Sequence, residues 1–269
     1  MKSHFRTLTI AGSDSGGGAG IQADLKTFSA LGCFGMSAIT ALTAQNTRVV
    51  TGIFPVPPEF IAQQMDAVLD DIGVDAVKIG MLHSPEVIET VAQKLVEKKC
   101  PNIVLDPVMI SKSGDKLLLD DAINALKKYL IPLASIITPN LPEASVLLDR
   151  RVETLGDMPK AARDLSALGS ANVLVKGGHL TQESCCDLLY QKKNNTITEF
   201  PEKRINTPNS HGTGCTLSSA IAANLAKGVD IETAVNNAKT YITCAIIAGA
   251  DYQTGKGHGP VHHFYDLWL

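Results

Sequence analysis

Short apolar runs alternate with amphipathic segments along most of the chain. The apolar and β-branched runs predict strands at residues 6–11, 35–45, 76–79, 102–105, 135–138 and 173–175. Apolar positions three and four apart predict helices from residue 21 and at residues 57–69, 84–96, 120–130, 142–148 and 158–168. Such alternation of strand and helix is typical of a mostly parallel sheet covered by helices on both faces. We therefore predict an α/β fold.

The pattern changes after residue 179. Two alternating segments, residues 186–191 and 196–200, flank a Lys-Lys-Asn-Asn turn, which predicts an antiparallel hairpin. A helix that ends near residue 226 and another at residues 231–248 follow. No repeat, low-complexity tract or linker interrupts the chain, so we predict a single domain over residues 1–269.

Composition and charge narrow the possible function classes. Of the 269 residues, 45% are hydrophobic and 19% are charged, which is the balance of an ordinary globular protein. The net charge is −3 and the basic residues are dispersed, which argues against nucleic acid as the main partner. No apolar stretch approaches the length of a membrane span, so no membrane partner is expected. The six cysteines form no C-x-x-C pair and follow no secretory leader, which predicts reduced thiols in a cytoplasmic protein.

A glycine-broken turn, residues 209–215, runs directly into a helix of small residues; we call it the anion turn. Gly212 and Gly214 permit successive backbone N–H groups to converge on one point. The following helix adds its first-turn donors and its positive dipole end, which favours a phosphate ligand. Cys215 lies at this helix N-terminus, so we expect a stabilised thiolate that acts as a base or nucleophile near neutral pH. A glycine turn that caps a buried helix, with Cys215 as an apolar filler, is an equally open interpretation of this stretch alone.

A glycine-rich loop, residues 12–20, follows the first predicted strand. It lacks the Gly-Lys-Ser/Thr ending of a P-loop and a G-x-G-x-x-G pattern, so neither standard phosphate fingerprint fits. It instead permits backbone to approach a compact substrate closely. Asp24, in the first turn of the next helix, is expected to point a carboxylate at that substrate; a solvated acid favoured by the helix dipole is the alternative.

Polar side chains end several predicted strands. Gln45 ends the strand at residues 35–45 and is a ligand candidate, because open α/β sheets bind at the carboxyl ends of their strands; a turn-forming amide is the alternative. Asp106 and Glu143 can hold Mg²⁺ together with phosphate and water. Lys176 can neutralise a nucleotide phosphate. Each has a capping or surface interpretation by itself, but with the anion turn they predict phosphoryl transfer.

Two other chemistries compete with this prediction. A nucleophilic Cys215 paired with His211 or His179 would make a hydrolase, but the sequence places no orienting third residue. The seven histidines show neither H-E-x-x-H nor any tight metal spacing, which argues against a zinc site.

Several longer motifs carry a resemblance to a known family. They are AGSD at 11–14, GGAGIQADLKTF at 17–28, TALTAQNT at 40–47, KIGML at 78–82, LDPVM at 105–109, TPNLPEA at 138–144, KGGH at 176–179, HGTGCTLS at 211–218 and GHGPVHH at 257–263. Together they resemble the hydroxymethylpyrimidine and phosphomethylpyrimidine kinases of thiamin biosynthesis, within the ribokinase-like superfamily. The motifs span nearly the whole chain, so the likeness does not rest on one match.

The resemblance implies a three-layer α/β/α sandwich, commonly a homodimer. It implies transfer of the ATP γ-phosphate, with Mg²⁺, to the hydroxymethyl group of the aminopyrimidine and then to the resulting monophosphate. By similarity, Gly12, Asp24, Gln45, Met81 and Val108 line the pyrimidine pocket; Gly212, Thr213 and Gly214 hold the transferring group; Lys176, Asn140 and Thr213 bind the nucleotide; and Asp106 and Glu143 hold the metal. Cys215 occupies the position where sugar kinases of the superfamily usually carry an aspartate base.

Two alternatives stay open beside that family. A pyridoxal or pyridoxine kinase of the same fold would also take a small heteroaromatic ring with a hydroxymethyl group, although Gln45 and Met81 favour the pyrimidine. A catalytically idle binding regulator is a different class, but it would not need Cys215.

Two glycine-rich segments stand apart from this match. Residues 15–18 read Ser-Gly-Gly-Gly where many relatives have a proline followed by Ser-Gly-Gly, and the glycine-rich residues 255–260 receive no role.

Overall fold

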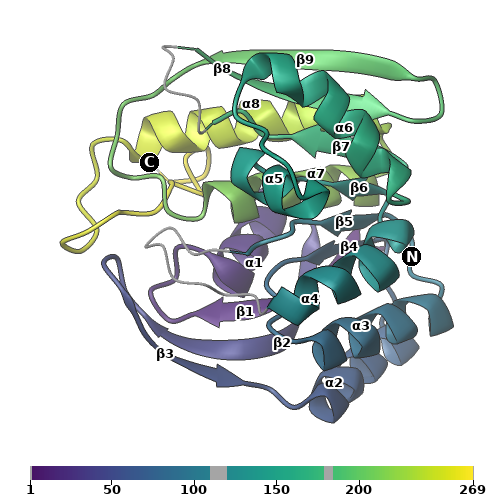
Figure 1. The fold of residues 1–269 in the computed structure, drawn as a ribbon. Helices are drawn as coiled ribbons and strands as arrows, with labels where there is room; N and C mark the ends of the chain where they lie inside the picture. The colour runs from purple at the N-terminus through teal and green to yellow at the C-terminus, as the bar shows by residue number, and fades with distance from the viewer. Residues whose placement is uncertain (1, 110–119, 179–183, 269) are drawn as a thin grey trace.

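The computed structural model of the protein describes residues 2–109, 120–178 and 184–268 (Figure 1). Within them, nine strands form one sheet in the order β3-β2-β1-β4-β5-β6-β7-β8-β9. The strands from β2 through β7 in this order run parallel, whereas β3, β8 and β9 each run antiparallel to their inner neighbour. The mostly parallel α/β fold predicted from the sequence is confirmed.

The strands are β1 (Arg6–Asp14), β2 (Phe34–Gln45), β3 (Val50–Pro55), β4 (Ala76–Ile79), β5 (Ile103–Leu105), β6 (Ile136–Ile137), β7 (Asn172–Val175), β8 (Ser184–Gln191) and β9 (Thr196–Lys203). The helices are α1 (Gly20–Ala30), α2 (Pro58–Asp71), α3 (Pro85–Glu97), α4 (Asp120–Ala125), α5 (Leu141–Leu148), α6 (Met158–Ala167), α7 (Thr213–Ala226) and α8 (Ile231–Gly249).

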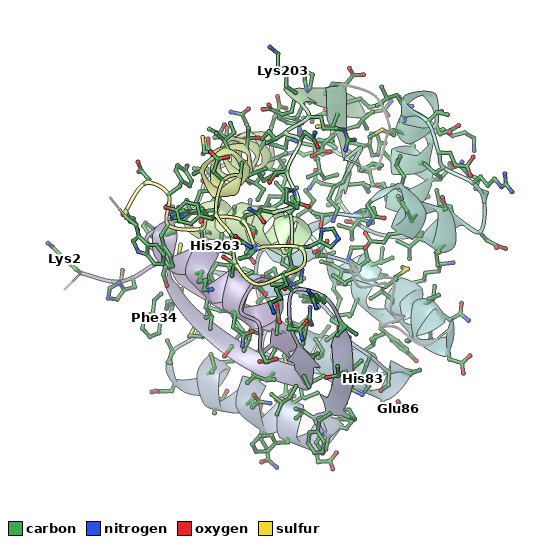
Figure 2. The ribbon with its side chains drawn as sticks, turned by 90° about the vertical axis from the view of Figure 1, so that its left-hand side faces the viewer. Lys2, Phe34, His83, Glu86, Lys203 and His263 are labelled. Carbon is green, nitrogen blue, oxygen red and sulfur yellow. The ribbon has the colours of Figure 1, made fainter. Side chains whose placement is uncertain are left out.

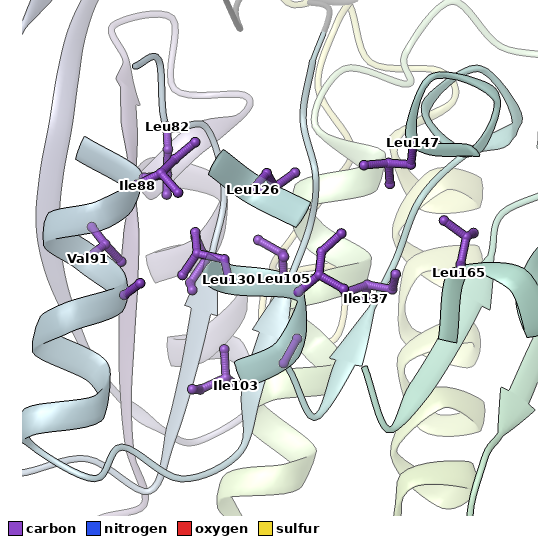
Figure 3. Packing of buried hydrophobic residues seen from close by; sticks show 14 of the residues in the cluster. Leu82, Ile88, Val91, Ile103, Leu105, Leu126, Leu130, Ile137, Leu147 and Leu165 are labelled. Atoms are coloured by element: carbon purple, nitrogen blue, oxygen red, sulfur yellow. The ribbon is translucent and has the colours of Figure 1, made fainter. Parts of the chain in front are cut away.

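Helices cover both faces of the sheet, which gives three layers (Figure 1). Helices α2 to α6 pack on one face, where Ile103, Leu105 and Ile137 of the strands meet apolar side chains of the helices (Figure 3). Helices α1, α7 and α8 pack on the other face. Nearly all of α7 after its first turn is buried, because its small residues let it lie between the sheet and α8.

Local capping decides where the site-bearing helix α5 begins. The Asn140 side chain accepts from the Glu143 amide at 2.8 Å, and the Glu143 carboxylate accepts from the Asn140 amide at 2.8 Å. This capping box satisfies two amides at the helix start and holds the Glu143 side chain at the sheet edge.

The C-terminal segment packs back against α7. His263 lies inside the molecule, whereas Lys2 and Lys203 project from its surface (Figure 2). The imidazole Nε2 of His263 lies 3.0 Å from the Thr216 hydroxyl, and the Tyr241 hydroxyl donates to the His263 carbonyl at 2.6 Å. The residue after Cys215 is thereby tied to the end of the chain.

Two elements differ from the prediction. Strand β3 was not predicted, because this edge strand is exposed along most of its length and lacks a buried face that would show as alternation. The helix predicted at residues 120–130 is regular only to Ala125 and continues as a π turn and a 3-10 turn around Pro132. Pro132 supplies no amide and its ring clashes with the turn before it, so no α-helix continues through this position. No described helix is long and apolar enough to cross a membrane.

Candidate active site

One cavity of about 850 Å³ lies at the carboxyl ends of the parallel strands. The ends of β1, β2 and β4 and the loops that follow β1, β4, β5, β6 and β7 line it together with the start of α7. It brings together nearly all residues nominated from the sequence: Gly12, Gln45, Met81, Asp106, Val108, Asn140, Glu143, Lys176, Gly212, Thr213, Gly214 and Cys215. Asp24 is the exception. Distant segments therefore meet at the edge where open α/β sheets bind ligands.

Within the anion turn, Gly212 has a backbone conformation and surroundings that favour glycine. Gly212 has a φ of 80° and directly precedes α7. A Cβ at Gly212 would overlap the carbonyl oxygen of Gly18, so the turn and the glycine-rich loop touch through backbone. The Thr213 hydroxyl donates to the Ser210 carbonyl at 2.8 Å and steadies the turn. Because first-turn amides lack acceptors within their helix, this turn offers N–H donors to an anion in the cavity.

The thiol of Cys215 corrects one sequence prediction. Burial raises the pKa of Cys215 to about 11; the Lys78 ammonium opposes this shift, while the Asp24 and Asp106 carboxylates add to it. The helix N-terminus alone predicted a lowered pKa, and that prediction was wrong because the lost solvation of the thiolate outweighs the helix dipole. Cys215 is therefore a neutral thiol at pH 7 and accepts a proton only after losing its own.

Lys176, Asp106 and Glu143 converge from three different strand ends. The Lys176 ammonium donates to Asp106 Oδ1 at 2.9 Å and lies 4.0 Å from Glu143 Oε2. The Thr138 hydroxyl donates to the same Asp106 oxygen at 3.0 Å. The expected meeting of these groups on one sheet edge is confirmed.

The pKa values of the two buried carboxylates, Glu143 and Asp106, shift in opposite directions. Burial raises the pKa of Glu143 to about 7, with Lys176 lowering it and Asp106 raising it. Burial also disfavours the ionised form of Asp106, but the Lys176 and Lys78 ammonium groups hold its pKa below the usual value. A divalent cation would relieve the negative charge that remains when both ionise. Mg²⁺ takes one or two carboxylates plus phosphate and water, so this pair fits it. Among residues 2–109, 120–178 and 184–268, no cluster of three or more metal-ligating side chains occurs.

Four of the residues nominated for a pyrimidine line the same cavity. A Cβ at Gly12 would come within 2.7 Å of the Met81 Cε atom, so Gly12 leaves room for Met81. The Gln45 Oε1 atom accepts from the Thr43 hydroxyl at 3.2 Å, and its Nε2 lies 3.4 Å from His211 Nε2. With Val108 these groups place an amide beside apolar side chains, which suits a small ring that carries donors and acceptors.

Asp24 lies behind the cavity wall, not on it. Its side chain is 0% exposed, and its oxygens accept from Lys78 Nζ at 2.9 Å, Thr9 Oγ1 at 2.6 Å and Ser219 Oγ at 2.6 Å. The structure thus shows neither the expected substrate contact nor the solvated alternative, because α1 turns this side chain into the interior. Lys78 is equally buried and contributes to the cavity wall. Its pKa is raised, since Asp24 and then Cys215 favour the charged form against burial.

Asp14 organises the glycine-rich loop. Its carboxylate accepts from the amides of Gly16 at 2.8 Å, Gly18 at 3.1 Å and Ala19 at 2.9 Å. His211 Nε2 lies 2.9 Å from Asp14 Oδ2. Burial opposes the charged form, yet the bonds from His211 and from these amides lower the pKa of Asp14. This carboxylate therefore joins the loop to the anion turn.

The contact between His211 and Asp14 also bears on the hydrolase alternative. His211 places its Nε2 on Asp14 and near Gln45, not against Cys215. His179, the other candidate partner, lies outside the described residues. Among the described residues, no histidine is hydrogen-bonded to Cys215, so His211 does not supply the pair that a cysteine hydrolase uses.

A profile described as phosphomethylpyrimidine kinase matches residues 14–262 of the chain. The chain belongs to this kinase family. It is 52% identical over 264 residues to the hydroxymethylpyrimidine/phosphomethylpyrimidine kinase of Rhizobium meliloti, with 97% of each chain covered. The Escherichia coli kinase of the same name is 47% identical over 98% of this chain and 99% of its own.

Solved structures agree with the family assignment. The phosphomethylpyrimidine kinase of Clostridium difficile matches with a TM-score of 0.80 and 49% identity over 90% of this chain and 99% of its own. The Bacillus subtilis pyridoxal kinase, solved as an ADP complex, matches with a TM-score of 0.90 and 41% identity over 98% of this chain and 100% of its own. The ribokinase-like α/β/α fold and the phosphotransferase class expected from the sequence are confirmed.

Several lining residues of this kinase site were not nominated from the sequence. Lys78 had a signal, since it is a lone charge inside the otherwise apolar strand β4. No sequence signal marked the cavity wall formed by residues 202–207 and by Ile242 and Ile246 of α8. In the sequence these positions have the pattern of an ordinary loop and an ordinary helix face. They became cavity wall only when α8 and the segment after β9 packed beside the anion turn.

Proposed function

We propose that this kinase transfers the γ-phosphate of ATP to the hydroxymethyl group of 4-amino-5-hydroxymethyl-2-methylpyrimidine, and then phosphorylates the monophosphate. The observation that carries the proposal is that one cavity contains both a ring pocket, made by Gly12, Gln45 and Met81, and a phosphate site, made by the anion turn and Lys176. The names of the relatives support the same substrate. A relative in Geobacter sulfurreducens, named as a thiamine biosynthesis bifunctional protein, supports its place in thiamin biosynthesis.

In this proposal the ring is held by shape and by one amide. The Gln45 side chain presents a donor and an acceptor, which complement an aminopyrimidine edge. The side chain lies between Thr43 and His211, which hold it at the cavity wall. Gly12, Met81 and Val108 supply the apolar contacts.

The phosphate side works by positioning and charge. Amides of the anion turn hold the transferring group, and Lys176 and Asn140 bind the nucleotide phosphates. When bound by Asp106 and Glu143, Mg²⁺ would neutralise charge on those phosphates. Complexes of a Staphylococcus aureus pyridoxal kinase with ADP and with AMP-PCP support the use of ATP.

The thiolate form of Cys215, which arises when the thiol releases its own proton to solvent, receives the proton of the substrate hydroxyl. Because the pKa of its thiol is about 11, the thiolate is a minor species at neutral pH but a strong base when formed. The Lys78 ammonium favours that thiolate.

The test is ATP consumption by the purified protein with hydroxymethylpyrimidine, its monophosphate and pyridoxal offered separately, with products resolved by mass. Phosphate on the pyrimidine, and a second on its monophosphate, is the expected result. Phosphorylation of pyridoxal alone would support the second candidate, which the likeness to the Bacillus subtilis pyridoxal kinase favours. Turnover of none of the three would leave the binding regulator as the leading alternative.

Two further expectations belong with this function. The cytoplasmic location and the homodimer stay predictions, the second resting on the family resemblance. Size-exclusion chromatography with light scattering distinguishes a dimer from a monomer of 28.6 kDa.

A further inference from the structure

Residues 255–260, here called the strap, follow α8 and contact the turn at the end of β2. The Gly257 amide donates to Thr47 Oγ1 at 3.1 Å, and the His258 amide donates to the Thr47 carbonyl at 2.8 Å. The Arg48 guanidinium donates to the Lys256 carbonyl at 3.3 Å. Thr47 lies two residues after Gln45, so this end of the strap holds the segment that carries the ring-binding amide.

The other end of the strap contacts the anion turn. The His211 amide donates to the Gly259 carbonyl at 3.0 Å, and His211 forms a parallel bridge with Pro260. His211 directly precedes Gly212, whose conformation starts α7. This end therefore holds the segment that carries the phosphate-binding amides.

Both ends of the strap lie too close to their neighbours to leave room for a side chain at Gly257 or Gly259. A Cβ at Gly257 would overlap the Thr47 carbonyl oxygen, and a Cβ at Gly259 would overlap the Asn209 side-chain oxygen. The Asn209 side chain is held in place, because its amide donates to the carbonyls of Gly249 at 2.8 Å and Ala250 at 3.2 Å. The strap is thus pressed against both cavity-bearing segments.

We propose that the strap is a positioning element, which sets the distance between the ring-binding segment around Gln45 and the phosphate-binding anion turn. Transfer needs the substrate hydroxyl in line with the γ-phosphorus at near-contact distance, and an error of about 1 Å can cost about 100-fold in rate. Gly257 and Gly259 touch neither substrate in this arrangement, because neither lines the cavity. They act through Thr47 and the anion turn. The inference rests on the proposed kinase function.

The test compares Gly257→Ala with Gly156→Ala. Gly156 lies in the short turn before α6, and a Cβ there would meet only ordinary contact, at 3.7 Å from the Thr154 hydroxyl. Gly257→Ala is expected to lower kcat about 10- to 100-fold, with KM for ATP and for the pyrimidine changed by no more than about threefold. Gly156→Ala should leave both unchanged.

A second readout separates positioning from partial unfolding. When the hydroxyl is displaced, water attacks the γ-phosphorus instead, the bond to ADP breaks, and inorganic phosphate forms. The ratio of ADP to phosphorylated pyrimidine should therefore rise in Gly257→Ala, although each folded chain still binds one pyrimidine. Thr47→Val, which removes the acceptor of the Gly257 amide at nearly constant volume, should shift the ratio in the same direction by less.

Amide hydrogen exchange tests the strap without turnover. Residues 45–49 and 209–214 should exchange several-fold faster in Gly257→Ala than in wild type or in Gly156→Ala. Unchanged exchange in both segments, or an unchanged kcat and product ratio in Gly257→Ala, would overturn the inference. Absence of any phosphorylated pyrimidine from wild type would instead overturn the proposed function, and the exchange result would still decide the strap.

Discussion

At the scale of single residues, the proposed mechanism gives Cys215 a different task in each of the two phosphorylations. The hydroxymethyl group carries a proton that must leave, whereas the monophosphate is largely an ionised oxyanion at pH 7 and has no such proton. Cys215→Ala should therefore lower kcat for hydroxymethylpyrimidine by about 100-fold or more, and kcat for the monophosphate by much less. Steady-state kinetics with each substrate measure the difference. Equal losses for both would assign Cys215 to holding the transferring group.

Replacing the thiol by a carboxyl should change the pH dependence of the first phosphorylation. With a pKa of about 11, the thiolate fraction of Cys215 grows with pH, so kcat of the wild type should rise through the neutral and alkaline range. In Cys215→Asp the base is already ionised at neutral pH, and this rise should disappear. Profiles of kcat between pH 6 and about pH 10 compare the two. A rise that persists in Cys215→Asp would mean that another group sets it.

The buried ion pair between Asp24 and Lys78 allows a prediction about the free energy of unfolding. Lys78→Met would leave the Asp24 carboxylate buried without its counter-ion, which costs about 3–5 kcal/mol in such pairs. Urea unfolding measures the loss, and Lys160→Met, at an exposed ion pair with Asp164, is the matched control with a much smaller change. The double variant Asp24→Asn with Lys78→Met should recover part of the loss. A mild effect of Lys78→Met alone would contradict the pairing.

At the scale of elements, the tie between α7 and the C-terminal segment should respond to pH. Burial lowers the pKa of His263 to about 4, against about 6.5 when unfolded, so the unfolded chain binds this proton first as pH falls. Protonation of His263 should therefore lower the free energy of unfolding by about 3 kcal/mol as the pH falls from 6.5 to 4. Above pH 6.5 the contribution of this group to stability is retained in full.

His263→Gln should flatten that part of the stability profile, since no proton is then taken up. The exposed His4→Gln is the control and should leave the wild-type slope intact. Urea unfolding at several pH values measures both variants. The same slope in His263→Gln as in wild type would assign the pH dependence to other groups.

At the scale of the whole molecule, the edge of the sheet offers a surface for the expected homodimer. Strand β3 ends the sheet, and Leu42, Ile53 and Phe54 are 47%, 44% and 67% exposed on β2 and β3. Exposed apolar edges are typical of association sites. If the homodimer uses this edge, Phe54→Glu should shift the protein towards monomer in light scattering. Val96→Glu on α3 is the control, and a dimer unaffected by Phe54→Glu would place the interface elsewhere.

The single domain expected over residues 1–269 also stays a prediction at this scale. The nine described strands share one sheet, so cooperative unfolding in one transition is the expected behaviour. Two separated transitions in calorimetry would contradict it.

The sequence by itself determined the alternation of strands and helices, the family and most of the site. Local periodicity marks elements because a buried face imposes its own spacing, and Gly212, Cys215, Glu143 and Lys176 stand in motifs whose chemistry is local. The same reasoning failed for β3, which has no buried face to leave a pattern.

Only the tertiary structure decided what surrounds each charge. Asp24 faces Lys78 instead of substrate, and the pKa of Cys215 rises instead of falling, because burial and neighbours from distant segments outweigh the local helix dipole. The strap received no role from the sequence for the same reason, since its partners Thr47 and His211 lie far from it along the chain. Solvation and contact depend on packing, and packing joins residues that no sequence spacing relates.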